Sequence, residues 1–256
     1  MAQSRPLKAS GLLGLAILTG VADPVAAYTE TLVADGGALE GLVRFTGTLP
    51  PRPRASRAGS DGGCQRSGSS TVLDLGPGRG AAGSVVLVQG VTEGKRGHFD
   101  VVLDGRGCAF VPPVVATMAG AGARVKNSAA TVLSVRGWRG RAPIFHVALP
   151  GLGQEVDITR RLTRPGIVRI ASDTAPHISA WVVVHDSPYL AVTDERGAFH
   201  IEDIPPGTYR VTVWHEGFRR RAIDQHGRPA YEAAHTITRE VTVAPRSRVT
   251  VAFELR

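Results

Sequence analysis

The stretch from residue 181 to residue 216 limits the possible folds of this chain more than any other part of the sequence. Short apolar runs rich in β-branched residues alternate there with turn-forming residues, as in strands joined by tight turns. Two turns stand out, at 194–197 and 205–207, and each ends in a Gly, which accepts the positive φ that tight turns often need. After each turn, apolar residues alternate with polar ones: Phe199, Ile201, Tyr209, Val211 and Val213. The pattern predicts an antiparallel meander.

The remaining sequence continues this pattern of short strands and turn residues. Further strands are predicted at 39–45, 85–89, 101–103, 109–118, 123–126, 131–135, 145–149, 167–170, 234–243 and 248–255. Pro112 and Pro113 predict an edge or irregular strand, because Pro cannot donate to a ladder. No long helical periodicity occurs, although 155–162 could form one helical turn, and 217–229 is expected to be a loop. Regularly spaced short strands indicate an all-β protein.

The first 27 residues have the pattern of a secretory signal peptide. Arg5 and Lys8 supply a positive region, and Gly11–Val21 supplies an apolar stretch that is short for a membrane span. Small residues at 25–27 predict cleavage near Ala27. We therefore expect a periplasmic or secreted protein, with no transmembrane segment in the mature chain.

The chain contains two cysteines, Cys64 and Cys108. In an oxidising compartment an even pair predicts a disulfide. Closing the loop between them would stabilise the fold by about 4 kcal/mol in the chain-entropy model. The alternative is two separate thiols, and neither cysteine lies in a spacing typical of zinc sites.

The net charge of +8 comes from dispersed basic residues, nearly all of them Arg, with a single run at 219–221. Nucleic-acid binding requires a basic stripe, so no nucleic-acid partner is predicted. A solvated basic surface, with a weak attraction to acidic envelope polymers, is the expectation that remains.

The sequence TDERGAFHIEDIPPGTYRVTVWHE resembles the T-D-x-x-G-x-F and I/L-P-P-G-x-Y core of carboxypeptidase regulatory-like domains. The resemblance implies a transthyretin-like β-sandwich, grouped with carbohydrate-binding-like folds, at residues 181–256. Hairpin geometry constrains these residues, so the resemblance concerns the fold and not a chemistry.

Residues 28–180 resemble the cupredoxin, or plastocyanin-like, half of an exported bacterial family often labelled methylamine-utilisation proteins. The resemblance is carried by GLVRFTGTLP, VVLVQ, GCAFVPPVV, VKNSAATVLSV, FHVALPG and PGIVRIASD. Its members join a cupredoxin to a carboxypeptidase regulatory-like domain. After the signal-peptide pattern of residues 1–27, the resemblance thus implies two β-sandwich domains, at 28–180 and 181–256.

The family's copper ligands are absent from the corresponding positions. Type 1 copper needs two imidazoles, a thiolate and a weak thioether. The family supplies these from R-N-S-D-P-x-x-H-N and C-D-x-H-P-x-M. Here the four positions hold other residues: Leu133, Ser172, Ala175 and Ile178. We therefore predict a degenerate cupredoxin with no cofactor.

A relocated metal site is the first alternative, with His177 and His146 as candidate ligands and His98 or His185 as further partners. Binding of envelope polysaccharide by the C-terminal domain is the second alternative. No catalytic residue is predicted, because the sequence contains no G-x-S-x-G, H-E-x-x-H or P-loop motif.

The sequence WHE at 214–216 is the most notable polar feature of the C-terminal domain. Trp214, His215 and Glu216 end a predicted strand, and we expect them to lie at an interface between the domains. The leading hypothesis is a non-catalytic exported protein that binds or scaffolds another periplasmic or envelope protein, as an accessory to an envelope redox or cytochrome system.

Overall fold

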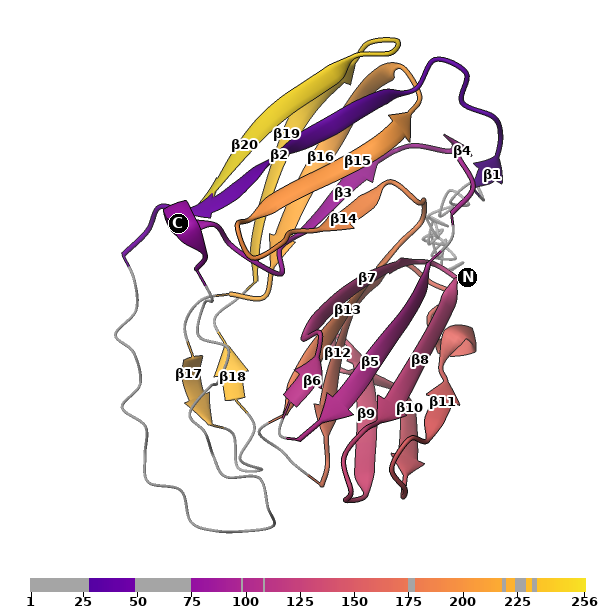
Figure 1. The fold of residues 1–256 in the computed structure, drawn as a ribbon, viewed down its shortest axis with the longest axis vertical. Helices are drawn as coiled ribbons and strands as arrows, with labels where there is room; N and C mark the ends of the chain where they lie inside the picture. Colours follow the sequence, from indigo (N-terminus) through magenta and orange to yellow (C-terminus); the bar gives the residue numbers. More distant parts are fainter. Residues whose placement is uncertain are drawn as a thin grey trace, which may run out of the picture.

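The structure is a computed structural model that describes residues 28–48, 75–97, 99–107, 109–174, 178–217, 220–223, 229–231 and 234–256. The chain forms two β-sandwiches, one above the other in Figure 1. The predicted all-β fold class is therefore confirmed. Within the described residues, no helix is long and apolar enough to cross a membrane.

The inserted sandwich, formed by β5 to β13, is the lower one in Figure 1. Its five-stranded sheet contains, in spatial order, β10 (Ala142–Leu149), β9 (Leu133–Arg139), β12 (Gly166–Ser172), β13 (Ser179–His185) and β7 (Val114–Met118). Its four-stranded sheet contains β11 (Glu155–Asp157), β8 (Gly122–Asn127), β5 (Asp100–Arg106) and β6 (Ala109–Val111). Alternating apolar residues of the two sheets, among them Leu103, Val125 and Ile170, form a buried core between them.

The discontinuous sandwich takes its strands from both ends of the chain. Its four-stranded sheet contains β14 (Leu190–Val192), β3 (Val85–Gln89), β16 (Gly207–His215) and β19 (His235–Val243). Its three-stranded sheet contains β15 (Ala198–Ile204), β2 (Gly37–Phe45) and β20 (Arg248–Leu255). A second core, including Leu39, Val86, Val213 and Phe253, fills the space between these sheets.

Six small elements complete the described chain. A parallel pair joins β1 (Thr29–Glu30) to β4 (Glu93–Gly94), and an antiparallel pair joins β17 (Arg220–Ile223) to β18 (Pro229–Tyr231). Two short 3-10 turns lie at Pro77–Arg79 and Thr159–Arg161. The possible helical turn at 155–162 is thus a short strand followed by a 3-10 turn, and the predicted loop at 217–229 contains strand β17.

The inserted sandwich interrupts the other one between β3 and β14. Strand β2 pairs with β15 and β20, and β3 pairs with β16, so N-terminal strands complete the C-terminal sandwich. The predicted division into 28–180 and 181–256 differs from this pairing, since β2 and β3 belong with the C-terminal strands and β13 belongs to the inserted sandwich. Local sequence patterns predict strands well, but a strand's partner depends on long-range packing.

The stretch 181–216 forms the predicted strands but not the predicted meander. Strand β13 lies in the inserted sandwich, and β14 and β16 lie in a different sheet from β15. The turn at 194–197 is confirmed: Asp194 Oδ1 accepts hydrogen bonds of 2.8 Å from the backbone N–H groups of Arg196 and Ala198. Gly197 has φ +76°, and a Cβ there would lie 2.2 Å from the Val43 carbonyl oxygen. The turn chemistry predicts a chain reversal, but it does not determine the sheet that receives the next strand.

An apolar cluster joins the two sandwiches. Val85, Leu190 and Trp214 of the discontinuous sandwich pack against the outer face of the five-stranded sheet. The inserted sandwich contributes buried Val114, Ala116 and Val183, with Trp181 partly buried beside them. The Trp181 and Trp214 rings meet edge to face, with centroids 5.4 Å apart. Burial of this extent favours one rigid body over two independent domains.

We predict that the two sandwiches unfold in one cooperative transition and that Trp214→Ala destabilises the whole chain by about 3–5 kcal/mol, because Trp214 is 3% exposed. Differential scanning calorimetry measures both quantities. Leu152→Ala is the control, since Leu152 is 68% exposed and its loss should cost less than about 0.5 kcal/mol. Two well-separated transitions in the wild type would contradict the prediction.

Candidate functional site

Three of the four positions that would hold copper ligands lie together at one end of the inserted sandwich. Ser172 N–H donates to the Ile178 carbonyl oxygen at 3.2 Å, which joins the end of β12 to the residue before β13. Asp173 N–H donates to the Ser134 carbonyl oxygen at 2.8 Å, which brings in the start of β9, where Leu133 lies. The fourth position, Ala175, lies outside the described residues.

The side chains at these positions do not fit type 1 copper. Leu133 is 6% exposed and Ile178 is 4% exposed, and both belong to the core of the inserted sandwich. Their hydrocarbon side chains have no lone pair to give to a metal. Ser172 is buried, with its Oγ 3.1 Å from Thr174 Oγ1. A serine hydroxyl does not replace the thiolate on which a blue copper site depends.

His146 lies in a polar cluster on the surface of the same end. Its Nε2 atom is 2.9 Å from Ser134 Oγ and 3.4 Å from Asp173 Oδ2. Asp173 Oδ2 also accepts hydrogen bonds from Arg136 Nε at 3.2 Å and Nη2 at 3.1 Å. The Asp173 carboxylate thus lies between the Arg136 guanidinium and the His146 imidazole and fixes the position of both side chains.

Among the other candidate metal ligands the structure describes only His185, and it does not bring His185 to His146. His185 is buried at the far end of β13, and its Nε2 lies 3.0 Å from the Val88 carbonyl oxygen. His98 and His177 lie outside the described residues, as do Cys64 and Cys108, so neither a relocated site at His177 nor the predicted disulfide is described. In the described part of the chain, no three His, Cys, Asp or Glu side chains are grouped for a metal ion.

Trp214 and His215 end strand β16, and Glu216 follows it, at the contact between the two sandwiches. Trp181 Nε1 of β13 donates a hydrogen bond to Glu216 Oε2, a polar contact from one sandwich to the other beside the Trp181–Trp214 ring contact. Burial raises the pKa of Glu216 to about 7, although the hydrogen bond from Trp181 acts in the opposite direction.

His215 is buried beside Glu216 and is neutral at neutral pH. Burial lowers the pKa of His215 to about 4, the nearby His235 adds to this effect, and a hydrogen bond with the Ala82 backbone opposes it. Gly217 N–H donates to His215 Nδ1 at 3.2 Å. An accepting Nδ1 places the proton of the neutral ring on Nε2.

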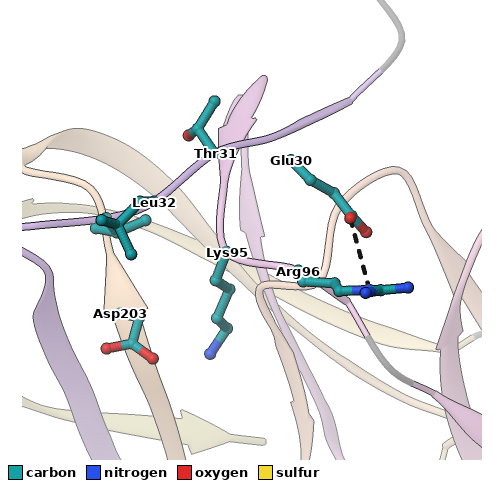
Figure 2. A pocket seen from close by; sticks show the side chains of 7 residues that line it. Glu30, Thr31, Leu32, Lys95, Arg96 and Asp203 are labelled. Carbon is teal, nitrogen blue, oxygen red and sulfur yellow. Dashed lines mark ion pairs between the residues drawn. The ribbon is translucent and has the colours of Figure 1, made fainter.

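A pocket of about 480 Å³ lies on the discontinuous sandwich and was not predicted from the sequence. Figure 2 shows Lys95 and Arg96, which follow β4, together with Glu30 of β1, Leu32 of the segment after it and Asp203 of β15. Lys95 lies between the strands predicted at 85–89 and 101–103, where the sequence shows no binding motif. One feature of the sequence could have drawn attention to this residue: Lys95 is one of three lysines in a chain rich in arginine.

Hydrogen bonds hold the backbone around this pocket. Tyr28 Oη donates to the Lys95 carbonyl oxygen at 2.7 Å, and Lys95 N–H donates to Tyr189 Oη at 2.9 Å. Tyr189 Oη donates in turn to the Asp203 carbonyl oxygen at 2.8 Å. Lys95 Nζ donates to the Glu202 carbonyl oxygen and lies over the Tyr189 ring. Burial lowers the pKa of Lys95, while Asp203 and Glu202 raise it.

Comparison with protein families matches residues 166–256 to the carboxypeptidase regulatory-like domain. The match is shorter than half of the chain and begins in β12, a strand of the inserted sandwich. Strands β2 and β3, which complete the discontinuous sandwich, lie outside it. A comparison with curated proteins gives no match.

Several solved structures show a distant likeness to part of the chain. A mutant of amicyanin in the Cu(I) state is 16% identical, with 39% of this chain and 98% of amicyanin covered and a TM-score of 0.30. A purple cupredoxin from Nitrosopumilus maritimus is 13% identical, with coverages of 33% and 96% and a TM-score of 0.28. A copper-containing nitrite reductase from Thermus scotoductus is 20% identical, with coverages of 34% and 22% and a TM-score of 0.30.

We predict opposite effects of Glu216 and His215 on the pH dependence of stability. A carboxyl whose pKa rises from 4.5 to about 7 on folding makes the free energy of unfolding fall as pH rises across that window, because the unfolded chain ionises first. An imidazole whose pKa falls from 6.5 to about 4 makes it rise between pH 4 and 6.5, because the unfolded chain binds the proton first. The two effects offset each other in the wild type between pH 4.5 and 6.5.

Urea unfolding of Glu216→Gln and His215→Gln across pH 4–8 separates these two contributions. Relative to wild type, the stability of Glu216→Gln should increase by on the order of 3 kcal/mol from pH 4.5 to 7. That of His215→Gln should decrease by a similar amount, on the order of 3 kcal/mol, from pH 4 to 6.5. Difference curves that are flat for both variants would refute the assignment.

Proposed function

We propose that this chain is a non-catalytic exported protein that binds or scaffolds a partner and whose cupredoxin-like sandwich does not use type 1 copper. The observation that carries this proposal is the burial of Leu133 and Ile178 in the core at two of the ligand positions. Ser172 at the position of the thiolate supports it. The side chains that would bind and tune copper are replaced by core packing and a serine hydroxyl.

The proposed partner surface is the end of the inserted sandwich around these positions. Val132, next to Leu133, is 49% exposed, and Leu152 is 68% exposed. Their two loops are joined through Asn127, whose Nδ2 donates to the Thr131 carbonyl oxygen at 2.9 Å and whose carbonyl oxygen accepts from Gly153 N–H at 2.6 Å. The proposal places these two exposed apolar side chains at the contact with the partner.

The partner we propose is another periplasmic or envelope protein. This rests on the signal-peptide pattern of residues 1–27 and on the resemblance to an exported redox-associated family. The apolar contact between the two sandwiches supports a scaffolding role, because such a contact would keep the surfaces of both sandwiches in a fixed relative position.

Restoring the four ligands tests the proposal at the copper positions. We predict that a variant with Leu133→His, Ser172→Cys, Ala175→His and Ile178→Met gains an intense visible absorption on addition of one equivalent of Cu(II), whereas the wild type stays colourless. The control carries the other three substitutions and keeps Ser172, so it lacks the thiolate and should stay colourless too. Stoichiometric copper binding by the wild type that is lost in His146→Ala would support the relocated metal site instead.

Removing the exposed apolar side chains tests the partner surface. We expect Val132→Ser with Leu152→Ser to reduce co-purification of a defined envelope protein by about tenfold or more, because such residues contribute most when buried at an interface. Val192→Ser, at a 36% exposed position on the discontinuous sandwich, is the matched control. Unchanged co-purification with the double variant would place the partner elsewhere, and repeated failure to recover any defined partner would count against a scaffold.

A further inference from the structure

The pocket in Figure 2 brings charges of both signs against an apolar surface. Lys95 and Arg96 supply two cations, and Glu30 and Asp203 supply two carboxylates. Leu32 and Val33 supply the apolar part of the lining. Its volume of about 480 Å³ is in the range of small-molecule sites.

The side chains around the pocket start from a well-defined backbone. The register of β15 against β2 shifts between Ile201 and Ile204, and Asp203 in this bulge has φ +56°. Lys95 Nζ and Tyr189 Oη donate to the carbonyl oxygens of Glu202 and Asp203 and so hold the bulge. A non-glycine residue held at positive φ beside a pocket is the kind of local strain that is enriched at ligand sites.

The ion pair between Arg96 and Glu30 in this pocket is long and exposed to solvent. Arg96 Nε is 3.7 Å from Glu30 Oε2, and the two side chains are 80% and 50% exposed. An ion pair of this geometry contributes little to stability. Both side chains can therefore contact a ligand with little loss of folding free energy. Leu32 is 94% exposed, more than any other large apolar side chain in the described part of the chain.

A second hollow of about 360 Å³ also has Lys95 and Arg96 in its lining. Its other lining residues are apolar (Phe99, Pro188, Leu190 and Ile201) and polar (His200 and Glu202). A ligand held at Lys95 and Arg96 therefore has apolar surface next to it in both hollows.

We propose that this pocket binds a zwitterionic molecule with an apolar substituent. The anionic end of the ligand is placed at Arg96 and Lys95, the ammonium group at Glu30 and Asp203, and the apolar substituent on Leu32. The pocket lining has equal numbers of cations and carboxylates. A simple anion would face the two carboxylates and a simple cation would face the two cations, so the lining favours a zwitterion. A short peptide and an ethanolamine phospholipid both have this chemistry. The proposal does not depend on the copper positions or on a protein partner.

Isothermal titration calorimetry of the full mature chain with leucyl-leucine and with dihexanoyl phosphatidylethanolamine tests the proposal. We expect saturable one-to-one binding of at least one of them, and the pair distinguishes a peptide from a lipid source. For the peptide, three analogues each remove one feature: N-acetyl-leucyl-leucine lacks the ammonium, leucyl-leucinamide lacks the carboxylate, and glycyl-glycine lacks the apolar groups. Each should bind roughly fivefold or more weakly.

Matched variants assign the binding to this pocket. Arg96→Gln, Asp203→Asn and Leu32→Ser should each weaken binding by roughly threefold to tenfold. Asn tolerates the positive φ of Asp203, so that variant removes charge without changing the bulge. The controls are Arg256→Gln, at an 83% exposed arginine 3.9 Å from Glu254, and Leu152→Ser. Absence of saturable binding by both zwitterions, or equal loss in the variants and their controls, would overturn the proposal.

Discussion

The pairing of β3 with β16 is the interaction on which the rest of this structure depends. Val86 pairs with Val213 and Val88 with Val211, across more than a hundred residues of intervening chain. The inward side chains of these strands fill the core of the discontinuous sandwich, while Val85 and Trp214 face the inserted sandwich. This two-sided burial explains why VVLV is a continuous apolar run instead of an alternating one.

The same arrangement places both candidate sites. Trp214 and Glu216 lie at the end of β16, so the strand that closes the discontinuous sandwich also holds the contact with Trp181. The Lys95 pocket lies near the point where the chain passes from the discontinuous sandwich into the inserted one. The neighbouring hollow includes Pro188, near the point where the chain passes back. Of the two, only the neighbouring hollow lies at the junction of the sandwiches, a place where ligand sites are common.

Much of the local structure was predictable from the sequence, and the long-range structure was not. Alternation at Phe199, Ile201, Val211 and Val213 and the turn chemistry of Asp194 and Gly197 predicted strands and a turn that the structure contains. The meander was wrong because alternation specifies which face of a strand is apolar but not which sheet it joins. The insertion was missed for the same reason, since β2 and β3 carry no local sign of their C-terminal partners.

The candidate sites show the same difference between what the sequence predicts and what depends on long-range structure. The resemblance placed Leu133, Ser172 and Ile178 at corresponding ligand positions, and the structure brings them to one end of the inserted sandwich. The Lys95 pocket was not predictable, because it depends on a bulge at Asp203 and on two segments that are distant in sequence. Glu216 was noticed as a polar residue at an expected interface, but its partner Trp181 comes from the other sandwich.

The most direct test of the claim that this chain does not use type 1 copper is to measure its copper content. The protein is recovered from its own compartment after growth in copper-replete medium. Metal analysis per chain, with any copper cupredoxin from the same preparation as the positive control, requires no reconstitution. We predict well below one copper per chain and no visible absorption band from a thiolate–copper centre. One tightly held copper per chain would contradict the proposal that core packing has replaced the metal site.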